Sequence, residues 1–275
     1  MSLLINDYIF IISTMVLAAI PVGFFAGLFG IGGGLISVPF LFFIFELLDF
    51  KEEFLMHLSV GTAFAITIMT AASSVLTHNK HKAVNFKKIK LFSFGVILGV
   101  IAGAIFASII NTKFLILFFS LVVFIFSFYL LFNKNNQNKI IPNISFLLKL
   151  FLGFISGFIS APMGITGAMM NVPILKYFGY EIKIAIGSSA AIGLIIALFG
   201  TISFLFSGLF LKADLPLSVG FVNVPAFLIF VPITTFMARI GANTVHSINK
   251  NKIQKYFGLF LIVIGTKFLY EYFKL

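Results

Sequence analysis

Residues 27–41 read Gly27-Leu28-Phe29-Gly30-Ile31-Gly32-Gly33-Gly34-Leu35-Ile36-Ser37-Val38-Pro39-Phe40-Leu41, with five glycines in the first eight positions. They lie inside an apolar run that extends from Ile9 to Leu48. Glycine costs about 1 kcal/mol per helix position relative to alanine, so consecutive glycines favour an interrupted helix. In lipid, the unpaired backbone groups of such a break must be covered by protein or by a water-filled cavity. The stretch therefore predicts a broken helix inside a larger assembly of helices.

The composition of the whole chain is that of an integral membrane protein. Of its 275 residues, 60% are hydrophobic and 10% are charged, and the mean hydropathy is +1.15. A soluble domain carries roughly 25% charged residues. The runs 91–110, 114–132 and 221–238 are each about as long as a bilayer-spanning helix, which needs ~20 residues. We predict an all-α polytopic integral membrane protein, and the sequence shows no removable signal peptide.

The net charge of +11 does not point to a nucleic-acid partner, because the lysines lie in short loops between apolar runs. Such loops carry the positive charge that marks the cytoplasmic side of a membrane. The chain has no cysteine, and of its four histidines only His78 and His81 lie close together, in a lysine-rich loop. We therefore expect no metal site and no cofactor. Paired catalytic residues within the spans, which an intramembrane enzyme needs, are not found either, so no catalytic residue is assigned.

The order of the apolar runs repeats, which indicates an internal duplication. Each half begins with a broken run and continues with three spans, and a polar linker separates the halves. A shift of 134 residues superimposes six residues of the first half on identical residues of the second: Gly30, Ile31, Gly33, Val38, Pro39 and Leu41 on Gly164, Ile165, Gly167, Val172, Pro173 and Leu175. We assign residues 1–132 to the first half, 133–145 to the linker and 146–275 to the second half.

The positions of the cationic loops favour inverted halves. Both the second-to-third loop and the last loop are basic and are expected in the cytoplasm; they contain Lys80, Lys82, Lys87, Lys88 and Lys90, and Arg239, Lys250, Lys252 and Lys255. A count of eight transmembrane helices places these loops on opposite sides. The conflict disappears if each broken run is a hairpin, which gives ten segments and inverted repeats. The 40 residues of Ile9–Leu48 are long enough for two passes.

The broken runs are the candidate binding site. A helix that begins inside a break directs free N–H groups and the positive end of its dipole toward the break, and glycine lets a ligand approach the backbone closely. Two such breaks near the membrane midplane are typical of a transporter site, and positive helix ends select an anion. The candidate substrate-binding residues are Gly30, Gly32, Gly33, Gly34, Ser37, Gly164, Thr166, Gly167, Asn171, Thr62, Ser188 and Arg239.

Each of these residues also has a structural interpretation. Gly27, Gly30 and Gly34 have the spacing that lets membrane helices pack closely. Hydroxyl groups such as those of Thr62 and Ser188 commonly bond within the fold, and Arg239 follows an apolar span, where it is positioned to anchor the chain in headgroups. The acidic cluster that starts at Glu46 is expected to lie in a solvated loop, and no carboxylate is expected at mid-membrane.

The glycine motif and its degenerate second copy, which ends Asn171-Val172-Pro173-Ile174-Leu175, resemble the sulfite exporter (TauE/SafE-type) family of bacterial inner-membrane permeases. The resemblance covers roughly residues 9–273, and the second copy departs from the glycine-rich pattern at Thr166 and Ala168. It implies a multi-pass protein of the bacterial cell membrane that transports a small sulfur-containing anion of the sulfite or sulfonate class. An anion channel, a non-transporting assembly subunit and a homodimeric state are left open.

The direction of transport follows from the charge of such a substrate. Moving one charge through the membrane potential is worth ~2.3 kcal/mol per 100 mV. A divalent anion at ~150 mV therefore gains roughly 7 kcal/mol on leaving the cell. Export needs no coupling ion, and we expect the protein to export its substrate.

Overall fold

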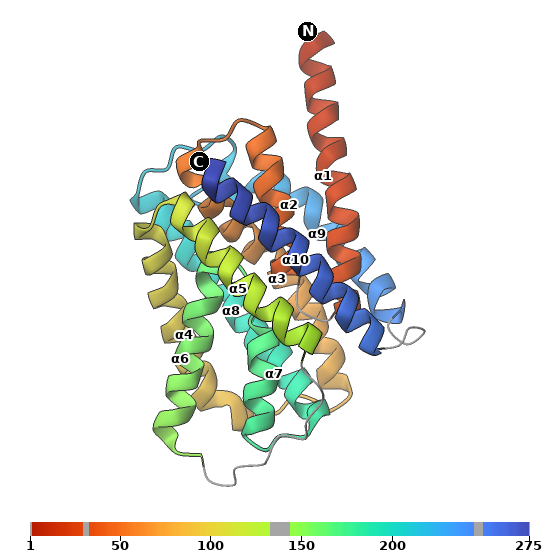
Figure 1. Cartoon of the computed structure of the whole chain (residues 1–275), viewed down its shortest axis with the longest axis vertical. Helices are drawn as coiled ribbons and strands as arrows, with labels where there is room; N and C mark the ends of the chain where they lie inside the picture. The colour runs from red at the N-terminus through yellow and green to blue at the C-terminus, as the bar shows by residue number, and fades with distance from the viewer. Residues whose placement is uncertain (1, 30–32, 133–143, 245–249, 275) are drawn as a thin grey trace.

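The computed structural model describes residues 2–29, 33–132, 144–244 and 250–274, and these are almost entirely helical (Figure 1). In chain order the elements are α1 (Ser2–Phe29), α2 (Gly34–Leu47), the 3-10 helix η1 (Glu52–Phe54), α3 (Leu55–Lys80), α4 (Phe86–Ile109), α5 (Thr112–Phe132), α6 (Phe146–Met163), α7 (Ala168–Tyr177), α8 (Ile182–Phe210), the paired strands β1 (Ser218–Val219) and β2 (Val222–Asn223), α9 (Val224–Thr244) and α10 (Lys250–Lys274). Eight helices in the described ranges are long and apolar enough to cross a membrane. The prediction of an all-α polytopic protein is confirmed.

Both broken runs are hairpins. In the first, Gly33 lies beside Ala26, so that the chain has already turned back on α1. In the second, Ser156 on α6 bonds to Asn171 on α7, which requires the two helices to run in opposite directions. The returning helices α2 and α7 have only 14 and 10 residues. At 1.5 Å per residue they measure about 21 and 15 Å, less than the ~30 Å of a hydrocarbon core.

The hairpins enter from opposite ends of the molecule. In Figure 1, α1 runs downward from the N-terminus to the middle and α2 returns upward, whereas α6 runs upward from the lower end and α7 returns downward. Helices α3 and α9 both run downward in this view, so their C-terminal ends point the same way. The hairpins therefore remove the conflict between the charge pattern and a simple count of eight spans.

Glycines let two pairs of parallel helices touch along their backbones. A Cβ atom added at Gly95, Gly99 or Gly103 of α4 would overlap the carbonyl oxygens of Leu150, Phe154 and Phe158 of α6, in that order. In the corresponding contact, Gly23 and Gly27 of α1 meet Thr234 and Ala238 of α9 in the same way. Close packing through small residues is a principal source of stability between membrane helices, because lipid provides no hydrophobic drive for their association.

Each main contact between helices has an equivalent contact when the two halves of the chain are exchanged. If α1–α5 correspond to α6–α10, the contact of α4 with α6 corresponds to that of α9 with α1, and the contact of α4 with α8 to that of α9 with α3. Helices α3 and α8 pack on each other, as do α5 and α10. Duplication predicts this pattern. The boundaries 1–132, 133–145 and 146–275 stay predictions, and residues 133–143 lie outside the described residues.

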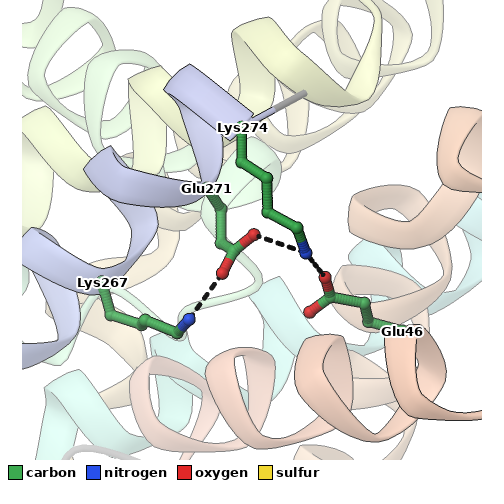
Figure 2. A network of polar contacts seen from close by, with 4 residues as sticks. All are labelled: Glu46, Lys267, Glu271 and Lys274. Atoms are coloured by element: carbon green, nitrogen blue, oxygen red, sulfur yellow. Dashed lines mark hydrogen bonds and ion pairs between the residues drawn. The ribbon is translucent and has the colours of Figure 1, made fainter.

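An ion-pair cluster joins the outer end of α2 to the end of α10 (Figure 2). Lys274 Nζ lies 2.6 Å from Glu46 Oε1 and 3.4 Å from Glu271 Oε2, and Lys267 Nζ lies 2.6 Å from Glu271 Oε1. The same two helices also meet through aromatic rings, since the Phe268 ring packs on the Phe42 ring. Helix α2 is thus attached to α10 by both charge and aromatic packing.

One expectation about an acidic residue was wrong, and one acidic residue was overlooked. Glu46 lies in the last turn of α2, half-buried and paired with Lys274, and not in a solvated loop. The carboxylate of Glu271 is only 2% exposed within the apolar helix α10, and the sequence analysis overlooked it. Its pairing with Lys267 one helical turn earlier accounts for its presence there, because burial of an unpaired charge is strongly unfavourable.

We expect Gly99→Ala to lower the free energy of unfolding by about 1–3 kcal/mol, because the new methyl group would overlap the Phe154 carbonyl oxygen in the α4–α6 contact. Gly265→Ala is the control. Its Cβ would lie 3.2 Å from the Phe124 ring, which is a side chain and not backbone. Thermal unfolding in detergent measures both; equal losses of stability would contradict the close-packing argument.

Loss of the buried carboxylate should also be measurable. Glu271→Gln removes the partner of Lys267 and weakens the attachment of α2, so we expect a loss of about 1–3 kcal/mol in unfolding free energy. Glu46→Gln, at a side chain that is 31% exposed, should have a smaller effect. Unfolding midpoints of both variants, measured at low and at high salt, would test this order. A larger loss of stability in Glu46→Gln than in Glu271→Gln would contradict the prediction.

Candidate anion-binding site

Each break is closed by a glycine in the left-handed conformation. Gly33 caps the start of α2 with φ 85° and ψ −22°, and Gly167 caps the start of α7 with φ 64° and ψ 10°. The two glycines occupy equivalent positions in the predicted repeat, 134 residues apart. Residues with a Cβ rarely adopt this conformation, so glycine is required at both helix starts.

The hydrogen bonds at the two helix starts are the same. The Gly33 carbonyl accepts from the N–H groups of Ile36 and Ser37, at 3.0 and 2.8 Å. The Gly167 carbonyl accepts from those of Met170 and Asn171, at 2.9 and 2.7 Å. Neither glycine offers a side chain to cap the first turn. The first N–H groups of α2 and α7 therefore have no acceptor in their own helices, and the positive ends of both dipoles lie at the breaks.

The two breaks contact each other in the interior. A Cβ at Gly34 would overlap the carbonyl oxygen of Gly164, and a Cβ at Gly164 would lie 2.6 Å from a methyl group of Val38. Gly164 itself has φ 65°. The start of α2 is therefore covered by the backbone of the second break. Gly30 and Gly32, which the sequence analysis assigned to the first half-site, lie outside the described residues.

Polar side chains gather at the second break. Ser156 Oγ donates a 2.6 Å hydrogen bond to Asn171 Oδ1, and both residues are fully buried. Asn171 Nδ2 and the hydroxyl of the fully buried Ser160 have no hydrogen-bond partner. The Cβ position of Gly167 lies 2.8 Å from Ser160 Oγ and 3.1 Å from Asn171 Nδ2. Two unpartnered polar groups therefore converge where Gly167 has no side chain.

The remaining predicted residues of the breaks have different surroundings. Thr166 is 2% exposed and its side chain packs against Gly193 of α8. Ser37 is buried, and its hydroxyl donates to the Gly33 carbonyl at 3.0 Å, one turn back in the same segment. The first half-site therefore has a serine that is already bonded, whereas the equivalent position of the second half-site has Asn171 with a free donor.

Thr62 and Ser188 have matching structural roles, since each bonds to an asparagine that precedes a helix of the other half. Thr62 Oγ1 accepts from the backbone N–H of Asn223 at 2.9 Å, and Ser188 Oγ accepts from that of Asn85 at 3.1 Å. Each of these asparagines in turn caps a helix, because Asn223 Oδ1 accepts from Ala226 N and Asn85 Oδ1 accepts from Lys88 N. The Thr62 hydroxyl thus fixes the start of α9, and the Ser188 hydroxyl fixes the start of α4. These contacts give both hydroxyls a structural role.

Arg239 does not join the buried residues of the breaks. Its side chain is exposed near the end of α9, which agrees with the anchoring role considered for it. Of the predicted residues, the structure brings Gly33, Gly34, Gly164, Gly167 and Asn171 together at the breaks. Thr166 lies in the second break with its side chain against α8, and Arg239 is not part of this buried group.

An open cavity of about 1110 Å³ lies elsewhere, between the start of α3 and the ends of α4 and α8. Its polar lining includes Glu53 and Asn111, and none of the predicted anion-site residues lines it. His57 at its base is buried, and Nε2 donates to the carbonyls of Ala107 and Ile110. A carboxylate in the lining does not favour an anion.

Ser156 and Ser160 are the site residues that sequence reasoning missed. The signal was present as two serines four residues apart, which places them on one face of an apolar helix directly before the break.

Comparison with known proteins now bears on this geometry. The family model described as "Sulfite exporter TauE/SafE" matches residues 15–268. A probable membrane transporter protein of Haemophilus influenzae is 29% identical over 258 residues, covering 94% of this chain and 97% of its own. Proteins of the same description from Methanocaldococcus jannaschii and Bacillus subtilis, the latter called YunE, are each 24% identical, covering 94% of this chain and 96% and 97% of theirs. No solved structure matches the chain.

The matched hydroxyls give a test that separates folding from binding. Thr62→Val and Ser188→Ala each leave a backbone N–H without its partner, which should lower the unfolding free energy by about 1–3 kcal/mol. The KM of the surviving transport should stay unchanged. Unfolding curves and flux measured on the same preparations would check both points; a raised KM at unchanged stability would return these residues to the binding site.

Proposed function

Because this chain belongs to the sulfite exporter TauE/SafE family, we propose that it exports a small sulfur-containing oxyanion, of the sulfite or sulfonate class, across a bacterial inner membrane. That it is a multi-pass membrane transporter and not an enzyme agrees with both the family and its relatives. One observation carries the proposal. Two hairpins that enter from opposite ends each contain a glycine-capped helix start, and the start of α2 touches the second break at Gly164 inside the protein.

The geometry supports an anion as the substrate. Each helix start is equivalent to roughly half a positive charge and presents N–H donors. The buried ionisable side chains of the described ranges are His57 and Glu271, and the contacts of neither one involve the breaks. Binding would then rest on helix dipoles and neutral hydrogen bonds, without an ion pair that would hold the anion too tightly to release it.

Export without a coupling ion is consistent with this composition. The membrane potential alone supplies roughly 7 kcal/mol for a divalent anion at ~150 mV. The buried carboxylate of Glu271 is already paired with Lys267 and Lys274 at the far end of α10. It offers no evident proton relay to the breaks.

A carrier is favoured over a channel by the contact between the breaks. Gly34 and Gly164 touch through their backbones, so the two hairpins are closed against each other here, and passage of a substrate between them requires their separation, as in alternating access. An assembly subunit without transport activity needs no pair of matched breaks. These arguments leave flux measurements as the decisive comparison.

The experiment is reconstitution into liposomes with an imposed potential and a panel of sulfite, sulfate, thiosulfate and small sulfonates. We expect saturable flux of at least one sulfur oxyanion that reverses with the sign of the potential. Gly33→Ala should reduce this flux at least about tenfold, because alanine at φ 85° costs roughly 1–2 kcal/mol and displaces the start of α2. Gly265→Ala is the matched control on a lipid-spanning helix.

The possible outcomes separate the alternatives. Flux that does not saturate would favour a channel. Flux that requires a proton or sodium gradient would overturn the uncoupled mechanism and keep the anion site. The absence of flux for every anion under every gradient would contradict transport of this class of substrate.

A further inference from the structure

The two half-sites are chemically unequal, and we infer that the oxyanion binds at the start of α7, between Ser160 Oγ, Asn171 Nδ2 and the first N–H groups of that helix. Ser156 acts as a positioning residue for Asn171. This assignment rests on the proposed anion transport and adds to it which half binds, through which donors, and what the other half contributes.

The first step is the state of the polar atoms at the second break. Ser160 and Asn171 are fully buried, and Ser160 Oγ and Asn171 Nδ2 have no hydrogen-bond partner. Burial of an unpartnered polar group costs about 1–3 kcal/mol. Two such groups beside one glycine are unfavourable for folding alone, and a ligand that accepts hydrogen bonds from both would offset the cost.

The second step is the place where these groups converge. They lie 2.8 and 3.1 Å from the point at which a Cβ of Gly167 would stand. Because Gly167 has no side chain, both donors lie directly against its backbone at the start of α7, and no Cβ stands between them and the first N–H groups of the helix. The N–H groups of Ala168 and Met169 follow directly, without acceptors inside α7. An acceptor bound here would also lie at the positive end of the α7 dipole.

The third step is the orientation of the Asn171 amide. Its oxygen accepts the 2.6 Å hydrogen bond from Ser156 Oγ, so its nitrogen faces Gly167 and Ser160. An amide that rotated by half a turn would present its oxygen to an anion and repel it. Ser156 therefore acts on the substrate only through Asn171.

The fourth step is the contrast with the first half. The start of α2 is covered by the Gly164 carbonyl oxygen, which places a partial negative charge there. Ser37, which stands where Asn171 stands in the second half, donates its hydroxyl to Gly33 at 3.0 Å. The described part of the first break thus has no side-chain donor to offer. The first break therefore closes the site, and the second break binds the anion.

The ligand class follows from the donors. Neutral N–H and O–H groups without a cation suit a small, dehydrated oxyanion with several equivalent oxygen atoms, since one oxygen meets Ser160 and Asn171 while others meet the N–H groups of α7. A bulky substituent would meet Val38 and Ile196, which border Gly164 and Gly167. Inorganic sulfur oxyanions fit this description better than large sulfonates.

The test uses the full-length protein in detergent and in liposomes, with sulfite as the probe. Ser160→Ala should raise the dissociation constant and KM for sulfite about tenfold or more, because a hydrogen bond to a charged group is lost. The same variant should unfold at the same or a higher temperature without anion, since it removes an unpartnered buried hydroxyl. A residue with a purely structural role would show the opposite pattern.

Further variants complete the comparison. Asn171→Asp replaces the donor with a negative oxygen of similar shape, and should abolish measurable sulfite binding. Ser156→Ala should raise KM with little change in the maximal rate, and Ser156→Thr, which keeps the hydroxyl, should restore it. Ser37→Ala is the matched control at the equivalent position of the first half, and its KM should stay within about twofold of the original.

The results distinguish the two proposals. If the unaltered protein neither binds nor transports any sulfur oxyanion, the proposed function fails. If it transports sulfite while Ser160→Ala and Ser156→Ala leave KM unchanged, or while Ser37→Ala raises it more than they do, the assignment to the second half is wrong and the function stands. Should Asn171→Asp fail to fold, Ser160→Ala alone decides.

Discussion

The fold depends on one constraint, which is that backbone exposed by a break in a membrane helix must be covered by protein. Lipid offers no hydrogen-bond partner to the N–H and C=O groups of a break. Here each break is covered by the other, with Gly34 packed against the Gly164 carbonyl and Val38 against Gly164. Neither half is therefore complete alone. The close contacts of α4 with α6 and of α1 with α9 hold the two hairpins at the depth at which they meet.

Hairpins that enter from opposite ends make this mutual cover compatible with ligand binding. Two parallel hairpins would direct both helix starts the same way, whereas inverted hairpins bring α2 and α7 to one region from opposite directions. The matched hydroxyls of Thr62 and Ser188 fit the same arrangement, because each accepts a hydrogen bond from an asparagine that caps a helix of the other half. Equivalent positions of the internal repeat can therefore share a structural role, such as helix capping, as well as a role in binding.

Features that depend on local backbone chemistry could be predicted from the sequence. Apolar run lengths predicted the helices, and the paired glycines predicted both breaks, because a left-handed helix start requires glycine at Gly33 and Gly167. Features that depend on partners distant in the chain could not. Nothing local distinguishes Ser160, whose hydroxyl has no partner, from Ser37, whose hydroxyl bonds one turn back. The surroundings of Glu271 depend on Lys274 and on Glu46, which is more than two hundred residues away.

An unequal pair of breaks also determines which contacts must change during transport. If the anion is held at α7, its negative charge competes with the Gly164 carbonyl for the positive end of α2, and this competition favours separation of the two breaks when substrate is present. Helix α2 is the arm with the firmer external attachment, through Glu46 with Lys274 and Phe42 with Phe268 (Figure 2). Helix α7 is shorter, and its side chains are less buried than those of α2. The first hairpin would therefore cover the site, and the second would bind the anion.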